Sequence, residues 1–196
     1  MPVRVFSQEE IDDLRTKMLN AGFPLLKQYG MTHTSISKIT NAAGIGVSTF
    51  YNFWKSKEEY MSDLILYHRK KMLPRLVPPE VLKGERKLRR DEVRVFFKAL
   101  TDEDLSIYPH MTLEDESRLI DSSDRFKPDI RKESAITAML LEHFENVRED
   151  PDLGLIANLT KILALSCEYK DRLHSSSYDK TIDRLVESIL DLIFKE

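Results

Sequence analysis

Glycine is scarce in this chain, and most of its glycines lie close together. Only 6 of the 196 residues are Gly, about half of the usual share of roughly 7%. Because glycine supplies the tight turns that connect strands, its scarcity favours helices. Four of the six, Gly22, Gly30, Gly44 and Gly46, fall in the N-terminal quarter and indicate turns there. We therefore expect an all-α fold.

Charge is distributed unevenly along the chain. Residues 1–75 hold 11 Lys or Arg against 7 Asp or Glu, a net charge of +4, whereas the remaining 19 Lys or Arg and 26 Asp or Glu give -7. A basic N-terminal part joined to an acidic remainder indicates that only the first part meets a polyanion. A basic face that is merely solvated would give the same imbalance, so both interpretations stay open.

Cysteine content and targeting signals favour a cytoplasmic protein. A single Cys167 allows no internal disulfide and no cysteine-based metal cluster, which suits a reducing compartment. The first ten residues lack the apolar core of a signal peptide, and no apolar run approaches 18 residues. We expect no membrane association.

The first two helices are predicted from their caps and their apolar spacing. Ser7 and Glu10 form a capping-box pattern that starts a helix, and Gly30 suits the residue after its end. Pro24 lies inside this helix, so we expect a kink near residues 22–24. Thr34 or Ser35 then caps a short second helix that stops at Gly44.

Two short helices joined by a tight turn predict a helix-turn-helix. The loop 44–46 leads into an expected third helix over 47–53, an arrangement typical of DNA-binding helix-turn-helix units. A second capping box, Ser56 with Glu59, opens a long fourth helix that runs to Pro74.

These residues resemble the DNA-binding domain of the TetR family of transcriptional regulators. The resemblance covers about 50 residues and rests on Tyr29-Gly30-Met31, on Ile39 with Ala42-Ala43-Gly44, and above all on the run Thr49-Phe50-Tyr51-Asn52-Phe53-Trp54-Lys55-Ser56-Lys57-Glu58-Glu59. It implies an N-terminal three-helix domain over 1–56, a connecting fourth helix over 57–75, and a helical regulatory and dimerisation domain over 76–196.

The resemblance and the helical spacing together assign the DNA-binding residues. Phe50 and Trp54 should face inward, while the N-terminal part of the third helix approaches base edges in the major groove. Hydroxyls and ammonium groups around it would contact phosphates. The expected DNA-binding residues are Thr34, Ser35, Val47, Ser48, Thr49, Tyr51, Asn52, Lys55 and Lys57. Outside this motif Lys55 and Lys57 would read as a solvated helix start, and Thr34 and Ser35 as caps first.

Residues beyond a charged linker at about 77–87 are predicted to be helical throughout. Helical patterns occur at about 91–101, 113–121, 129–148, 152–173 and 178–194. The last two carry wide apolar stripes, and in TetR-like proteins the final two helices of each subunit build a four-helix dimer interface. The expected interface residues are Leu155, Leu159, Ile162, Ile182, Leu185, Ile189 and Ile193. The alternative is two helices that cover the core of a monomer.

A ligand pocket is expected among inward residues of the middle helices. The candidates are Phe96, Phe97, Leu100, Met139, Leu140, His143 and Phe144. Each also reads as ordinary core, and His143 as a buried histidine with its hydrogen bonds satisfied. The acidic run Glu114-Asp115-Glu116, with Asp121 and Asp124, is interpreted as a solvated loop rather than a cation site. We assign no metal and no cofactor.

The function predicted from the sequence is regulatory. The resemblance implies a homodimer that binds a palindromic double-stranded DNA operator and is released by an unidentified small-molecule effector, most simply as a repressor. The alternative is a TetR-like interaction module or coactivator with secondary DNA binding. An enzyme is not expected and no catalytic residue is assigned, because the chain has no GxGxxG, Walker-type, GxSxG or HExxH motif.

Overall fold

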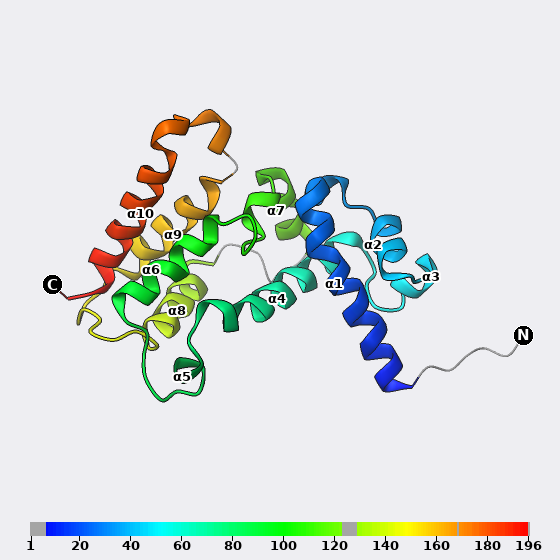
Figure 1. Cartoon of the computed structure of the whole chain (residues 1–196), viewed down its shortest axis with the longest axis horizontal. Helices are drawn as coiled ribbons and strands as arrows, with labels where there is room; N and C mark the ends of the chain where they lie inside the picture. Colours follow the sequence, from blue (N-terminus) through cyan, green and yellow to red (C-terminus); the bar gives the residue numbers. More distant parts are fainter. Residues whose placement is uncertain (1–6, 123–128, 168, 196) are drawn as a thin grey trace, which may run out of the picture. The chain divides into compact units, whose positions relative to one another are not determined.

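The chain folds into helices, as expected. The computed structural model describes residues 7–122, 129–167 and 169–195. In these ranges it contains α-helices, short 3-10 turns and two isolated β-bridges (Figure 1). The first helices are α1 (Gln8–His33), α2 (Ile36–Ala43), α3 (Val47–Phe50), α4 (Lys57–Leu76) and α5 (Pro79–Leu82). They are followed by α6 (Arg90–Lys98), α7 (Leu113–Ser122), α8 (Ile130–Leu141), α9 (Leu153–Leu165) and α10 (Tyr178–Ile193).

Two compact units make up the molecule. The N-terminal unit comprises the described residues up to 68 together with 110–122, and the C-terminal unit comprises 69–109 and the described residues from 129 onward. The division falls inside α4, which is one uninterrupted helix. Residues 110–122, which include α7, therefore join the first unit although they are separated from it in the sequence.

Helix α1 begins with the predicted capping box. The Ser7 side chain accepts from the Glu10 amide at 3.2 Å, and the Glu10 carboxylate accepts from the Ser7 amide at 2.9 Å. The expected kink near Pro24 is wrong in position, because Gly30 (φ 70°, ψ 169°) is the one residue of α1 with non-helical angles. A positive φ costs glycine little, so the bend occurs there.

Gly22 lets α1 and α4 approach closely. A Cβ at this position would lie 2.6 Å from Leu64 Cδ2 and would also collide with the Tyr60 hydroxyl. Both Tyr60 and Leu64 are fully buried. Glycine is therefore required at this point by the packing of the two helices rather than by its own backbone angles.

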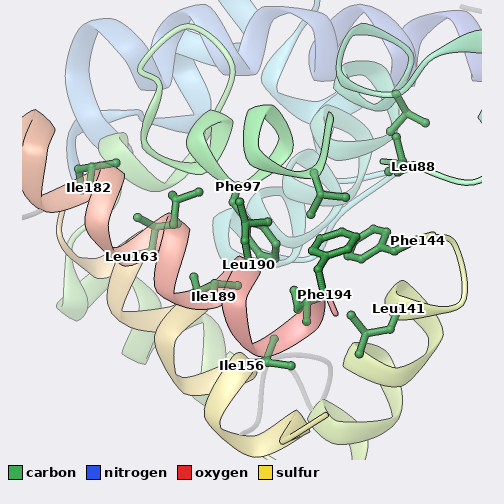
Figure 2. Packing of buried hydrophobic residues seen from close by; sticks show 14 of the residues in the cluster. Leu88, Phe97, Leu141, Phe144, Ile156, Leu163, Ile182, Ile189, Leu190 and Phe194 are labelled. Atoms are coloured by element: carbon green, nitrogen blue, oxygen red, sulfur yellow. The ribbon is translucent and has the colours of Figure 1, made fainter. Parts of the chain in front are cut away.

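The C-terminal unit is a helical bundle with one apolar core. Helix α10 packs on α6 and α9, and α8 packs on α9 (Figure 1). Figure 2 shows Ile182, Ile189 and Leu190 of α10 lying in the same cluster as Phe97 of α6 and Leu163 of α9. Ion pairs lie beside this core, including Arg90 and Arg94 of α6 with Glu187 of α10. Two isolated bridges, Leu88 with Phe144 and Val147 with Phe194, join the loops.

Candidate DNA-binding surface

The turn between α2 and α3 has the geometry that its glycines allow. Ser35 caps α2 by accepting from the Lys38 amide at 3.3 Å. Gly44 ends the helix in the left-handed region (φ 67°, ψ 35°), and its amide donates a hydrogen bond to Asn41 O. Gly46 precedes α3 without a side-chain cap. Helix α3 spans only Val47–Phe50 and continues as turns to Phe53, so it is shorter than the helix expected over 47–53.

Three buried aromatic rings anchor the end of α3. Phe50, Trp54 and Tyr60 are at most 1% exposed, and their ring centroids lie 4.9 to 5.5 Å apart. Trp54 Nε1 donates to Asp63 Oδ2 at 2.9 Å, and the Tyr60 hydroxyl donates to Met18 O at 2.8 Å. Burial raises the pKa of the Tyr60 phenol. The polar atoms of two of these rings are therefore satisfied, and the end of α3 is fixed onto α1 and α4.

The opposite side of α3 faces solvent. Val47 is 43% and Tyr51 54% exposed, Ser48 and Asn52 are exposed, and Thr49 is half-buried. An exposed valine and tyrosine beside two short polar side chains present methyl, hydroxyl and amide groups together. These are the groups that read base edges in a major groove.

The structure separates the two hydroxyls that precede α2. Thr34 is completely buried, and its hydroxyl donates to Gly30 O at 2.7 Å. It closes the bend at the end of α1 and does not reach the exposed surface. Ser35 is exposed and serves as the cap. The sequence left the cap open between the two residues, and the hydrogen bond from the Lys38 amide to the Ser35 hydroxyl identifies Ser35 as the cap.

Three lysines lie around this surface. Lys55 is exposed, and Lys57 is half-buried with its ammonium donating to Met31 O at 3.1 Å and Thr32 O at 3.2 Å. An ammonium has three N–H donors, so one remains for a phosphate. Lys38 donates to His33 O at 2.8 Å and lies over the Tyr29 ring at 4.1 Å. The sequence analysis did not select Lys38, although its position three residues after the Ser35 cap places it beside the turn.

Comparison with known proteins bears on the same residues. Residues 18–62 match the family model described as bacterial regulatory proteins, tetR family. This segment belongs to the TetR family. The match spans α1 from Met18 onward, α2, α3 and the start of α4, and so contains the turn, the aromatic anchor and the exposed face. No match is found among curated proteins.

Solved structures extend the similarity of fold beyond the TetR segment. The reduced form of Escherichia coli NemR is 19% identical, with a TM-score of 0.60 over 92% of this chain and 97% of its own. A TetR regulator from a Rhodococcus species is 14% identical, with a TM-score of 0.58 over 95% and 98%. NalD, the secondary repressor of the MexAB-OprM multidrug efflux pump in Pseudomonas aeruginosa, is 18% identical, with a TM-score of 0.50 over 94% and 98%. Nearly the whole chain therefore has the TetR fold.

The expected dimer residues divide into three groups. Ile182, Ile189 and Ile193 are at most 4% exposed inside the subunit core, so their assignment to an interface is corrected: this side of α10 packs on its own subunit. Leu155 and Ile162 of α9 are 41% and 51% exposed. The two remaining residues, Leu159 and Leu185, are half-buried.

The expected pocket residues also separate. Phe97 and Phe144 are buried in the core cluster, with Phe96, Leu100 and Leu140 packed against it. Met139 is 64% exposed and His143 is exposed, so neither is an inward residue. Met139 lies on the outer side of α8, and His143 lies just after the end of this helix. The helical spacing of the sequence did not show which of these side chains faces the core.

The acidic run is helical rather than a loop. Glu114 and Glu116 are exposed in α7, but Asp115 is 2% exposed, which corrects its interpretation as a solvated residue; Asp124 lies outside the described residues. Within the described ranges, no three His, Cys, Asp or Glu residues are grouped to hold a metal ion. No described helix has both the length and the apolar character needed to cross a bilayer.

Proposed function

We propose that this TetR-family protein is a homodimeric repressor that binds a palindromic DNA operator and leaves it when a small molecule binds. The observation that carries the proposal is the exposed face of α3, which a buried aromatic cluster holds in place. A face fixed before binding loses little entropy on contact with DNA. Its membership in a family of bacterial regulatory proteins supports the same function.

Each exposed group on α3 has a role that its chemistry suits. Val47 would contact a thymine methyl, Ser48 several base edges, and Asn52 the adenine edge in a bidentate pair. Thr49, Tyr51 and Lys55 would contact phosphates together with Ser35 and the remaining donor of Lys57. Thr34 is left out of the proposed surface because it is buried.

Helices α9 and α10 would form the dimer interface through a narrower face than the sequence indicated. Leu155, Leu159 and Ile162 remain partly or largely exposed on α9, and Leu185 with Leu192, seven residues later, is half-buried on α10. Apolar side chains at helical spacing on two adjacent helices suit a four-helix contact with a second copy. Exposed leucine and isoleucine would then be removed from water.

The sign of regulation and the effector site rest on the family. NalD is a repressor, and its similarity to this chain in fold supports repression here. We place the effector in the C-terminal unit beside Phe96, Leu100 and Leu140, which are only partly buried at the margin of the core. A thermal-shift screen of metabolites should raise the melting temperature when the effector binds, because a ligand that binds the native state stabilises it.

A sequence-selection experiment with the full chain tests DNA binding directly. The expected result is a palindromic DNA sequence. The logarithm of the binding constant should fall linearly with the logarithm of the salt concentration, with a slope of about -0.9 for each phosphate contact. Asn52→Ala should weaken binding about tenfold and relax preference at one base pair, because a bidentate pair is lost. Lys55→Ala should weaken binding to all sequences and lower the salt slope by about 1.

Lys83→Ala is the matched control for charge. Lys83 is exposed in the C-terminal unit, directly after α5, so its removal should leave the salt slope unchanged. Failure of the wild-type chain to select any DNA at low salt would contradict the proposal and favour a role as a protein-interaction module.

A further inference from the structure

Residues 110–122 follow α6 in the chain but are packed into the N-terminal unit. Their contacts with α1 include an aromatic pair and a hydrogen bond. The ring of His110 meets Phe23 edge-on, with centroids 5.8 Å apart, and Asp115 of α7 accepts a hydrogen bond from Thr32 Oγ1 at 2.8 Å. The proposed DNA-binding unit therefore includes a segment that the TetR match over residues 18–62 does not contain.

The Asp115 carboxylate has both of its oxygens engaged. Oδ2 accepts from the Thr112 amide at 3.1 Å and from its hydroxyl at 3.0 Å, while the Asp115 amide donates to Thr112 Oγ1 at 3.1 Å. These bonds cap α7. Capping alone does not require a buried carboxylate. The neighbouring side chains Glu114 and Glu116 remain exposed. Asp115 is 2% exposed, and a buried carboxylate is tolerated only when hydrogen bonds offset its desolvation.

Thr32 lies in the turn that leads into the recognition elements. Gly30 bends the chain at a φ of 70°, Lys57 of α4 donates to the carbonyls of Met31 and Thr32, and Ser35 caps α2 three residues later. Lys57 thus holds the backbone of this turn, and Asp115 holds its side chain. A shift of the turn changes the start of α2, on which α3 depends.

We propose that Asp115 is a positioning residue for the DNA-binding surface. Its hydrogen bond to Thr32 holds the turn at the end of α1 in the arrangement that binds DNA, and loss of this bond lowers DNA affinity. The inference rests on the proposed DNA-binding function and assigns to that function a positioning residue outside residues 18–62.

Thr32→Val tests the contact, because it removes the hydroxyl while preserving the shape of the side chain. Operator affinity should fall about fivefold to tenfold, the effect of one intramolecular hydrogen bond. Thr32→Ser keeps the hydroxyl and should restore binding. Thr112→Val is the matched control, since it removes the cap of α7 but leaves the Thr32–Asp115 bond in place, and it should affect affinity less than Thr32→Val.

Amide hydrogen exchange on the DNA-free protein provides an independent readout. Thr32→Val should speed exchange of the amides in residues 110–122, because the segment opens more often when one of its contacts to α1 is lost. Unchanged exchange, or faster exchange with wild-type operator affinity, would overturn the positioning role alone. Loss of all DNA binding by the wild-type protein would instead overturn the proposed function and this inference with it.

Discussion

Glu92 ties the start of α6 to the loop before it. Arg86 donates to both oxygens of its carboxylate at 2.7 Å, and the Arg89 amide donates to Oε2 at 2.9 Å. The Glu92 side chain is 15% exposed. The hydrogen bonds from Arg86, opposed in part by desolvation, lower the pKa of Glu92 to about 2. The folded chain therefore stabilises the ionised form of the Glu92 carboxyl group relative to the unfolded chain.

Glu92→Gln should destabilise the protein in a pH-dependent way. Because the folded pKa lies below the unfolded value of about 4.3, the stabilisation is present above about pH 4.3 and is lost as the pH falls toward about 2. We expect a loss of about 1 to 2 kcal/mol in the free energy of unfolding near pH 7. Urea unfolding from about pH 7 to 2.5 measures how far the difference closes.

The matched control for this change is Glu114→Gln. Glu114 pairs with Arg118 at 2.6 Å on the surface of α7, but its side chain is 74% exposed. An exposed pair of this kind contributes little, so its substitution should leave stability almost unchanged at every pH. A constant difference between wild type and Glu92→Gln across the whole range would contradict a lowered Glu92 pKa.

Local residue signals were readable from the sequence, whereas partners far along the chain were not. The Ser7–Glu10 box is found as predicted because its two members lie within one helical turn. Asp115 was interpreted as solvated because it lies in an acidic run. Its hydrogen-bond partner Thr32 lies 83 residues earlier, and the sequence around Asp115 does not indicate this contact. Burial of that kind depends on which helix packs over the residue, and spacing within α7 does not contain this information.

The positions of the helices along the chain were predicted well from the sequence. The side of each helix that packs on the core was predicted less well. The periodicity of α10 correctly identified an apolar stripe, but it did not say whether the stripe meets its own subunit or a second one. Ile182, Ile189 and Ile193 pack inside the subunit. Both environments remove the same side chains from water, so hydrophobic spacing alone does not distinguish them. Leu155 and Ile162 of α9 were named as interface residues from the sequence, but their exposure became known only from the structure.

Ile162→Glu tests the α9 face as a dimer contact. Ile162 is 51% exposed within one subunit, so a charge there should leave the fold intact while opposing burial against a second copy. We expect the protein to sediment as a monomer at concentrations where the wild type is a dimer. Val95→Glu is the matched control, since Val95 is 57% exposed on α6, away from the proposed interface. Equal sedimentation of wild type and Ile162→Glu would contradict the interface.

At the scale of the whole molecule, neither compact unit is a single continuous stretch of the sequence. The resemblance to the TetR family placed the boundaries at the ends of helix four, and that division stays an expectation. In the structure, α4 passes from one unit to the other and α7 returns to the first. A return of this kind follows from packing between distant segments, and composition along the chain carries no trace of it.

A dimer with two recognition helices makes a geometric demand on its operator. Symmetry-related α3 segments can enter successive major grooves only when the half-sites are about one helical turn, or 34–36 Å, apart. Insertion of roughly 5 bp between the half-sites turns one of them to the opposite side of the duplex. Binding to the altered operator should fall to the level of a single half-site, as measured by a mobility-shift titration.

Two controls separate this geometry from simple loss of affinity. An insertion of about 10 bp keeps the half-sites on one side of the duplex and changes only their distance, so it should weaken binding less than the insertion of roughly 5 bp. Ile162→Glu, if monomeric, should bind wild-type and altered operators equally, because one α3 segment does not sense spacing. Undiminished binding of the wild-type protein to the operator with roughly 5 bp inserted would contradict a symmetric dimer that reads both half-sites at once.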